Sequence, residues 1–156
     1  MGITIRQASG ISDMESVRIL FTAYAQSLPV DLAYQGFDLE LATLPGKYAP
    51  PAGTLLLALD GANNAVGCVG VRPMDNGTCE MKRLYVGPPG RGTGAGRKLA
   101  EAAIAAARNM GYREMRLDTL PSMAAAQGLY ASLGFVRIEL YYETPVEGTV
   151  FMSLSL

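Results

Sequence analysis

The sequence of 156 residues contains no histidine, and this absence excludes much of enzyme chemistry. Catalytic triads use an imidazole as the general base, and most zinc sites include histidine ligands. Any proton transfer in this protein must therefore use a carboxylate, tyrosine, lysine, cysteine or water. We expect no metal site.

Cysteine is scarce as well. Cys68 and Cys79 are too few for the disulfide framework of a small secreted protein. Each lies within an apolar pattern typical of a strand. We therefore predict that both are reduced residues of the core.

Charge imbalance and long hydrophobic runs are also missing. The 13 basic and 14 acidic side chains nearly cancel, so the protein has no strong field with which to hold a long nucleic acid. No apolar run reaches the roughly 18 residues needed to span a bilayer. The N-terminal residues lack the charged and apolar regions of a signal peptide. These absences predict a cytoplasmic protein without nucleic-acid or membrane partners.

The sequence does contain enough apolar residues for a core. Its length and its 49% hydrophobic content predict a single domain over residues 1–156. An alternating pattern predicts a strand at 3–8, and apolar segments bounded by turn residues predict strands at 54–60, 65–73, 79–86, 115–119, 135–138 and 150–156. Helical spacing predicts helices after Asp13, more weakly over 31–44, from a glycine-rich segment to Met110, and from a Ser122 cap to Leu133.

The order of these elements predicts an α/β fold with a mixed sheet. The three strands between residues 54 and 86 follow one another through tight turns and should form an antiparallel meander. A helix joins the strands at 79–86 and 115–119, so these two strands should lie parallel in the middle of the sheet.

The segment 88–97, PPGRGTGAGR, places four glycines immediately before the best-defined helix. The first turn of a helix has unpaired N–H groups and the positive end of the helix dipole, so it attracts anions. Glycine lets a phosphate approach those amides because it has no Cβ atom. A loop that only had to be flexible would not need glycine at the helix start, where it costs about 1 kcal/mol relative to alanine. The segment therefore predicts a phosphate-binding loop.

The residues leave the kind of phosphate ligand open. A nucleoside triphosphate loop is excluded because no Lys-Ser or Lys-Thr pair follows the last glycine. Gly90, Gly92 and Ala95 satisfy a permissive dinucleotide fingerprint, and Asp118 ends the next strand, where a ribose-binding acid could lie. However, an antiparallel meander precedes the glycines and only about 60 residues follow them. A nicotinamide-dependent oxidoreductase is therefore the weaker alternative.

Two linked motifs resemble the GNAT superfamily of acyl-CoA-dependent N-acyltransferases. Residues 91–96, RGTGAG, are similar to its R/Q-x-x-G-x-G/A signature and follow the strand MKRLYV. Residues 117–138, LDTLPSMAAAQGLYASLGFVRI, are similar to its second conserved region, A-x-x-x-L-Y-x-x-L-G-F on a helix before a strand. The resemblance is close over residues 79–138. It implies a mixed, mostly antiparallel sheet of six to seven strands, with a central splayed parallel pair and about four flanking helices.

The resemblance implies acetyl-CoA as the acyl donor and assigns residues to it. The pantetheine arm would run along Leu84, Tyr85 and Val86 like an added strand, and an amide near Val86 would stabilise the oxyanion. Met123 stands where relatives often have Asn near the pantetheine. Seven residues would bind the pyrophosphate through their main-chain amides: Arg91, Gly92, Thr93, Gly94, Ala95, Gly96 and Arg97.

The resemblance also implies two catalytic residues. Tyr130 matches the tyrosine that donates a proton or a hydrogen bond to the CoA sulfur, and a phenol with its ordinary pKa near 10 suits that task. Glu80 lies early in the strand that leads to the cofactor, where the family often has a glutamate that acts as a base through water. Each residue also has a purely structural interpretation. Tyr130 could be an aromatic residue of the core, and Glu80 could be a carboxylate that faces solvent.

The acceptor site has the weakest signal in the sequence. Lys82 and Arg83 are expected to face water or to touch phosphate. The segments that wall this site in the family contain aromatic and acidic residues, which predict a small pocket that accepts a cation: Tyr24, Tyr34, Phe37, Tyr141 and Tyr142, with Asp31, Asp38 and Glu143.

Together these inferences predict an N-acetyltransferase. It would transfer an acetyl group from acetyl-CoA to a primary amine of a small molecule or peptide by direct attack, without a metal. The alternatives are a noncatalytic acyl-CoA sensor and the oxidoreductase named above. The resemblance also implies that the protein can form homodimers.

Overall fold

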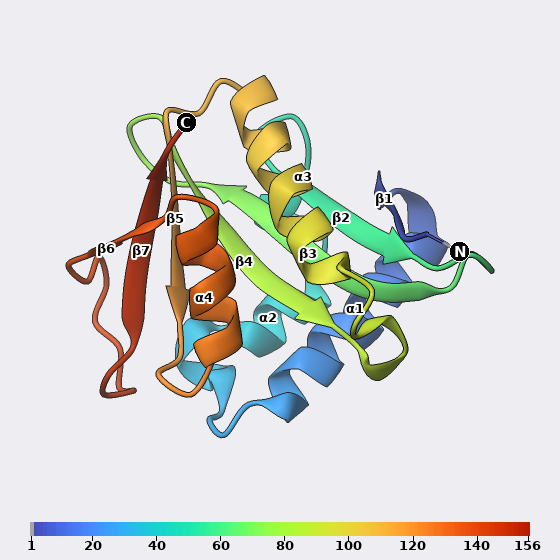
Figure 1. Cartoon of the computed structure of the whole chain (residues 1–156), viewed down its shortest axis with the longest axis horizontal. Helices are drawn as coiled ribbons and strands as arrows, with labels where there is room; N and C mark the ends of the chain where they lie inside the picture. Colours follow the sequence, from blue (N-terminus) through green and yellow to red (C-terminus); the bar gives the residue numbers. More distant parts are fainter. Residues whose placement is uncertain (1) are drawn as a thin grey trace.

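The computed structural model of the chain describes residues 2–156 and contains a seven-stranded sheet with helices on both faces (Figure 1). The strands are β1 (Thr4–Gln7), β2 (Thr54–Leu59), β3 (Ala65–Pro73), β4 (Thr78–Val86), β5 (Glu114–Thr119), β6 (Val136–Ile138) and β7 (Val150–Ser155). The α-helices are α1 (Gly10–Ser27), α2 (Phe37–Ala42), α3 (Ala95–Asn109) and α4 (Ala124–Ser132). Short 3₁₀ helices are η1 (Leu32–Gln35), η2 (Gly46–Tyr48) and η3 (Pro88–Gly90).

The sheet is mixed and mostly antiparallel, as predicted. Its strand order is β1-β2-β3-β4-β5-β7-β6, and β4 with β5 is the one parallel pair within residues 2–156. α3 connects these two strands, and a parallel pair requires such a crossover. The predicted fold class, a parallel pair at the centre and four α-helices, is confirmed.

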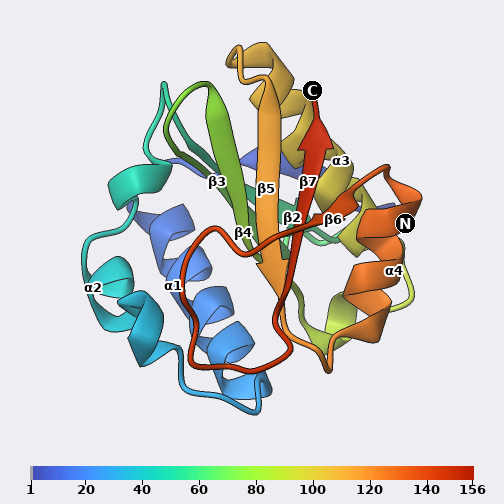
Figure 2. The same cartoon turned by 90° about the vertical axis from the view of Figure 1, so that its left-hand side faces the viewer.

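Helices cover both faces of the sheet, α1 and α2 on one face and α3 and α4 on the other (Figure 2). Strand β2 shows how the sequence encodes the two layers. Leu55 and Leu57 belong to the core under α1, whereas Leu56 and Ala58 belong to the core under α3. Because both faces of this strand are buried, it reads as an uninterrupted apolar run and does not alternate.

Strands β4 and β5 separate soon after they pair. Their pairing covers only the first three residues of each strand and ends at Glu80 opposite Arg116. Past this point β4 contains a bulge, because its register against β3 shifts between Cys68 and Gly70. Arg83, at the bulge, has a left-handed φ of 61°. A bulge bends and twists a strand, so it directs the second half of β4 away from β5. The predicted splayed pair is therefore present.

Three helix boundaries differ from the sequence-based expectation. The helix expected over 31–44 is divided into η1 and α2 because Gly36 adopts a left-handed φ of 71°. Helix α1 begins at Gly10, before Asp13, whose carboxylate accepts a hydrogen bond from the Ser9 amide at 2.8 Å. The prediction that Ser122 caps α4 is wrong: α4 begins at Ala124, and no side chain caps it.

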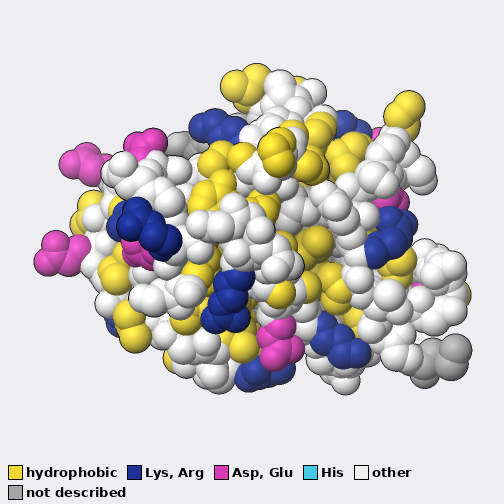
Figure 3. Space-filling model, turned by 90° about the horizontal axis from the view of Figure 1, so that it is seen from above, with side chains coloured by type: hydrophobic (Ala, Val, Ile, Leu, Met, Phe, Trp, Pro, Cys, Tyr) yellow, Lys and Arg dark blue, Asp and Glu magenta, His cyan; other side chains and the backbone are white. Residues whose placement is uncertain are grey.

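Buried cysteines and a surface of mixed charge match the composition. Cys68 and Cys79 are fully buried and free, as predicted. No helix within residues 2–156 is long and apolar enough to cross a membrane. On the face drawn in Figure 3, basic and acidic side chains are scattered, and the described residues form no continuous patch of either sign there.

Gly70 generates a prediction about stability. An added Cβ at this position would lie 2.5 Å from Cε1 of Tyr48, a buried ring that contacts Phe21 edge-on. We expect Gly70→Ala to lower the free energy of unfolding by about 1–3 kcal/mol, because the core has no room for the methyl group. Urea denaturation measures this change.

Gly128→Ala is the matched control. Gly128 is exposed within α4, and an added Cβ there would meet nothing within 4 Å. This substitution should raise the free energy of unfolding by up to about 1 kcal/mol through helix propensity. Equal effects of the two substitutions would show that the Tyr48 ring does not prevent a larger residue at position 70.

Candidate active site

The glycine-rich segment forms a loop between β4 and α3 whose amides are free. Lys98 is the first residue of α3 whose amide donates a helical hydrogen bond, to the Gly94 carbonyl at 3.1 Å. The six amides of residues 92–97 donate to no main-chain or side-chain acceptor in the described chain, 2–156. Among residues 2–156, no side chain caps the N-terminus of α3 through a hydrogen bond. This end of the helix can therefore bind an anion.

The four glycines of the loop serve different purposes. Gly92 and Gly94 have φ values of 76° and 80°, which favour glycine. Gly90 packs so closely that a Cβ would lie 2.9 Å from Cγ1 of Val86. Packing within the protein does not require glycine at position 96, because the nearest atom would lie 3.8 Å from an added Cβ. Because Gly96 has no side chain, the groove stays open next to the free amides.

A groove of about 450 Å³ runs from this loop along the splayed end of β4. It is bounded by the start of α3, the start of α4 and the C-terminal end of α1. Six residues on its walls were expected at or near the cofactor: Leu84, Tyr85, Val86, Arg91, Gly96 and Met123. The structure thus brings the strand assigned to pantetheine and the loop assigned to pyrophosphate into one groove.

A small cavity of about 30 Å³, the junction pocket, lies where β4 and β5 separate. It is continuous with the groove through shared residues, Tyr24, Leu84 and Met123. Tyr130 lines it and makes no hydrogen bond through its hydroxyl within the described residues. Thr119 also lines it, and its Oγ1 is the one buried side-chain oxygen or nitrogen in the described chain without a partner.

The environment of Tyr130 gives its hydroxyl a higher pKa than the ordinary value expected from the sequence. The side chain is buried and packs edge-on against Phe135, with ring centroids 5.7 Å apart. Burial raises the pKa of Tyr130 above its ordinary value of 10.0. The phenol is therefore protonated at any physiological pH and is better suited to donating a hydrogen bond than a free proton.

A third cavity, the acceptor pocket, opens beyond the junction pocket and has a volume of about 310 Å³. The two cavities share Tyr34, Gln35 and Lys82. Tyr141 and Tyr142 reach this pocket on the loop between β6 and β7, which crosses toward the α1 and α2 side of the sheet (Figure 2). Groove, junction pocket and acceptor pocket therefore follow one another along β4.

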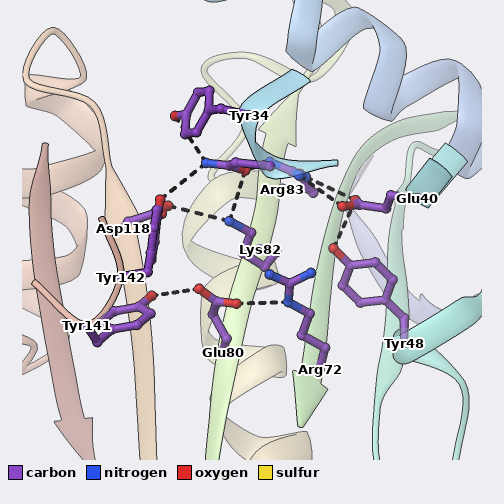
Figure 4. Close-up of polar contacts among 11 residues, drawn as sticks. Tyr34, Glu40, Tyr48, Arg72, Glu80, Lys82, Arg83, Asp118, Tyr141 and Tyr142 are labelled. Carbon is purple, nitrogen blue, oxygen red and sulfur yellow. Dashed lines mark hydrogen bonds and ion pairs between the residues drawn. The ribbon is translucent and has the colours of Figure 1, made fainter. Parts of the chain in front are cut away.

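Glu80 lies in the wall of the acceptor pocket and is only 4% exposed (Figure 4). Its Oε1 accepts from Nε of Arg72 at 2.8 Å, and its Oε2 accepts from the Tyr141 hydroxyl at 2.6 Å. Burial raises the pKa of Glu80, but the charges of Lys82 and Arg72 and these hydrogen bonds bring it below the ordinary 4.5. Glu80 is a paired carboxylate that stays ionised at neutral pH, and it is not solvated.

Lys82 and Asp118 form a second buried pair beside the first. Lys82 Nζ lies 3.6 Å from Asp118 Oδ1 and donates to Oε1 of Gln35 at 3.2 Å. Asp118 also accepts a hydrogen bond from the Tyr142 hydroxyl. Burial lowers the pKa of Lys82, and the attraction of Asp118 offsets part of this effect. The expectation that Lys82 faces water is wrong, because the bulge and the splay place it inside the molecule.

Arg83 is also buried, so the expectation that it faces water or touches phosphate is wrong. Its Nε and Nη2 donate to Glu40 at 3.0 and 2.9 Å, and its Nη1 donates to Gln35 at 2.7 Å. The guanidinium also lies 5.2 Å from the ring centroid of Phe37. Tyr48 donates a further hydrogen bond to Glu40 at 3.0 Å. These contacts hold the bulged residue of β4 in place.

The acceptor residues expected from the sequence are only partly brought together. Tyr34, Tyr141 and Tyr142 line the acceptor pocket, and Tyr24 lines the groove and the junction pocket. Phe37 instead packs on Arg83. The three acids expected to attract a cation, Asp31, Asp38 and Glu143, line none of these cavities.

Sequence reasoning missed Gln35, Thr119 and the role of Asp118. Gln35 accepts from Lys82 and Arg83 and donates to the hydroxyls of Tyr34 and Tyr142. A lone glutamine in a weak helical segment gives no signal of this kind. The sequence did contain a usable signal for Asp118 and Thr119, because polar residues at the end of a strand beside a parallel partner often lie at a site.

Known proteins support the interpretation of this geometry. Residues 18–135 match the Acetyltransferase (GNAT) family. An uncharacterized N-acetyltransferase of Schizosaccharomyces pombe is 41% identical over 92% of this chain and 89% of its own length. An acetyltransferase of the GNAT family from Staphylococcus aureus has a TM-score of 0.82 at 20% identity over 99% of both chains. A GNAT phosphinothricin acetyltransferase from Sinorhizobium meliloti, solved with AcCoA, has a TM-score of 0.73 at 20% identity, covering 100% of this chain and 89% of its own.

The fold is that of the solved GNAT acetyltransferases. The chain belongs to the GNAT family of acetyltransferases, which confirms the resemblance seen in the sequence. It is an acyltransferase enzyme. These relatives favour neither a nicotinamide-dependent oxidoreductase nor a noncatalytic sensor.

The buried pair of Glu40 and Arg83 generates a second prediction. Glu40→Ala would leave the Arg83 guanidinium buried without its carboxylate, so we expect the free energy of unfolding to fall by about 3–5 kcal/mol at neutral pH. Interactions with Arg83 hold the pKa of Glu40 below its ordinary 4.5 despite burial. The stabilisation is therefore complete above that pH and is lost as the pH falls through the folded-state pKa.

Urea denaturation of wild type and Glu40→Ala at several pH values measures both effects. Glu15→Ala is the matched control, because Glu15 pairs with Arg18 at the surface. The control should change the free energy of unfolding by less than about 1 kcal/mol. If Glu40→Ala behaved like Glu15→Ala, the pair would not hold the bulge.

Proposed function

We propose that this protein transfers an acetyl group from acetyl-CoA to the primary amine of a small molecule or peptide. The observation that carries the proposal is the set of six free amides at residues 92–97, which open at the N-terminus of α3 beside the groove. Each hydrogen bond from an amide to a charged oxygen contributes about 1.5–3 kcal/mol, so several converging amides suffice to bind a diphosphate.

The described residues fit acetyl-CoA along the whole path of the groove. The amides of residues 92–97 would bind the pyrophosphate. The Arg91 amide, which was expected to take part, donates instead to the Pro88 carbonyl at 3.3 Å. Leu84, Tyr85 and Val86 would bind the pantetheine arm along the edge of β4 that β5 leaves unpaired. The unpartnered Thr119 hydroxyl would accept or donate a hydrogen bond at the inner end of the arm. The complex of the Sinorhizobium meliloti relative with AcCoA supports this choice of donor.

Acetyl-CoA supplies an acetyl group that is activated as a thioester. In the proposed reaction a neutral amine enters through the acceptor pocket and attacks directly, so that a C–N bond forms and the C–S bond breaks. The amide near Val86 would stabilise the oxyanion, and Tyr130 would hydrogen-bond the sulfur as it leaves. Glu80 would receive the proton of the amine through water, as an ionised carboxylate. No metal takes part in this scheme.

We also place this reaction in the cytoplasm and in a single domain. The two free, buried cysteines support a reducing compartment, because neither is held in a disulfide.

Gly96→Ala separates cofactor binding from folding. The added Cβ would lie 3.8 Å from its nearest protein neighbour, so the free energy of unfolding should stay constant or rise by up to about 1 kcal/mol. The same methyl group would keep a phosphate away from the amides. We expect the Kd of acetyl-CoA, measured by titration calorimetry, to increase at least about tenfold through the loss of one charge-assisted hydrogen bond.

The control for this experiment is again Gly128→Ala, which makes the same change in an exposed turn of α4. It should leave the Kd of acetyl-CoA unchanged. Wild-type affinity in Gly96→Ala would contradict the proposed binding of pyrophosphate at this loop.

Thiol release tests the reaction itself. With acetyl-CoA and a panel of amines, the wild type should release the thiol of CoA, and Tyr130→Phe should lower kcat by about 10²-fold. The Kd of acetyl-CoA should hardly change, because phenylalanine keeps the packing against Phe135.

Tyr112→Phe is the control, since the Tyr112 hydroxyl bonds the Ala52 carbonyl and neither residue lines the groove, the junction pocket or the acceptor pocket. Its kcat should equal that of the wild type. Binding of acetyl-CoA without thiol release from any amine would instead support a noncatalytic acyl-CoA sensor.

A further inference from the structure

The acceptor pocket has an inner and an outer end. Its inner end is shared with the junction pocket through Tyr34, Gln35 and Lys82. Lys47 and Arg72 line the acceptor pocket but not the junction pocket, so they lie at its outer end. Under the proposed function, the reacting amine occupies the inner end, and the rest of the acceptor extends toward Lys47 and Arg72.

The carboxylates around this pocket are already engaged. Both oxygens of Glu80 are bound, one by Arg72 and one by Tyr141. Both oxygens of Asp118 are bound as well, one by Lys82 and one by Tyr142. Glu40, on the far side of Arg72, is held by Arg83 and Tyr48. None of these acids is left free to select a second cationic group on the acceptor.

The cations at the outer end are not fully engaged. Arg72 binds Glu80 through a hydrogen bond from Nε, and its two terminal nitrogens donate no hydrogen bond to residues 2–156 (Figure 4). Lys47 is exposed on η2 and has no ion pair within the same range. Both residues also line the neighbouring cavity beside Glu40. A guanidinium with two free donors beside an ammonium group matches the geometry and the charge of a carboxylate.

We propose that the acceptor is an amine that also carries a carboxylate, and that Arg72 and Lys47 bind this carboxylate. The amine then points inward to Lys82 and the junction pocket, where it is acetylated. This inference rests on the proposed acetyl transfer. It adds a carboxylate to the amine expected from the sequence, so that the acceptor is a zwitterion, an amino acid in the broad sense.

The test compares amino acids with their carboxamides, which keep the shape and remove the charge. The series runs through glycine, β-alanine, γ-aminobutyrate, ε-aminocaproate and phenylalanine, and kcat/KM is corrected to the concentration of neutral amine. At the best length the acid should exceed its carboxamide by about tenfold. Lys47→Gln should lower kcat/KM for the acid by about three- to fivefold and leave the carboxamide unchanged.

Arg108→Gln removes the same charge from an exposed position in the last turn of α3 and should change neither value. A second measurement does not depend on catalysis. The N-acetyl derivatives of the same acids and carboxamides are titrated into the protein with CoA, and the acids should bind more tightly in the wild type but not in Lys47→Gln.

The outcomes separate the two proposals. Absence of thiol release from every amine counts against the proposed function, and the binding of the N-acetyl derivatives then decides the inference alone. Carboxamides that match the acids in both measurements would overturn the inference. An equal loss for acids and carboxamides in Lys47→Gln would also overturn it, because the residue would then not recognise the carboxylate.

Discussion

The structure depends on one constraint, the early separation of β4 from β5. The two strands share only three paired positions, after which the bulge at Arg83 turns β4 away. A left-handed φ at a residue with a long side chain costs on the order of 1–3 kcal/mol, and the surrounding structure must hold it. Here Glu40 and Gln35 do so by binding the Arg83 guanidinium, and Phe37 packs beside it. Groove, junction pocket and acceptor pocket all follow from this local distortion.

The same distortion explains why so many charged groups lie inside a small protein. Glu80, Lys82 and Arg83 lie within four residues of β4, at and just after the last position paired with β5. All three side chains are buried between the strands and the α1 and α2 layer (Figure 4). Buried charges are tolerated only when they are paired and hydrogen-bonded. Partners therefore come from segments far apart in the sequence, Glu40 from α2, Asp118 from β5 and the tyrosines from the loop before β7. This arrangement orders the acceptor pocket before any substrate binds.

The sequence allowed the fold to be predicted and the loop and strand proposed for the cofactor to be located, because their signals are local. Glycines before a helix and the strand MKRLYV are contiguous segments, and the cavity at Leu84, Val86 and Gly96 joins them as expected. The acceptor side could not be predicted in the same way. Lys82 was expected to face water but is buried, because its position depends on the bulge in β4. The residue types in this strand do not predict the bulge. The role of Gln35 was not predicted, because its contacts with Lys82 and Arg83 form only when η1 packs beside β4.

In the proposed reaction one strand serves two ligands, and the layout of the cavities is consistent with this. The groove lies at the starts of α3 and α4, whereas the acceptor pocket lies among residues from η1, η2 and the loop before β7. A cofactor and an acceptor can therefore approach the junction pocket from different sides without competing for the same residues. The proposed pyrophosphate contacts come from main-chain amides, so they tolerate changes of side chain. The acceptor side consists of side chains on short segments, so specificity can change there while the sheet and the loop at residues 92–97 stay the same.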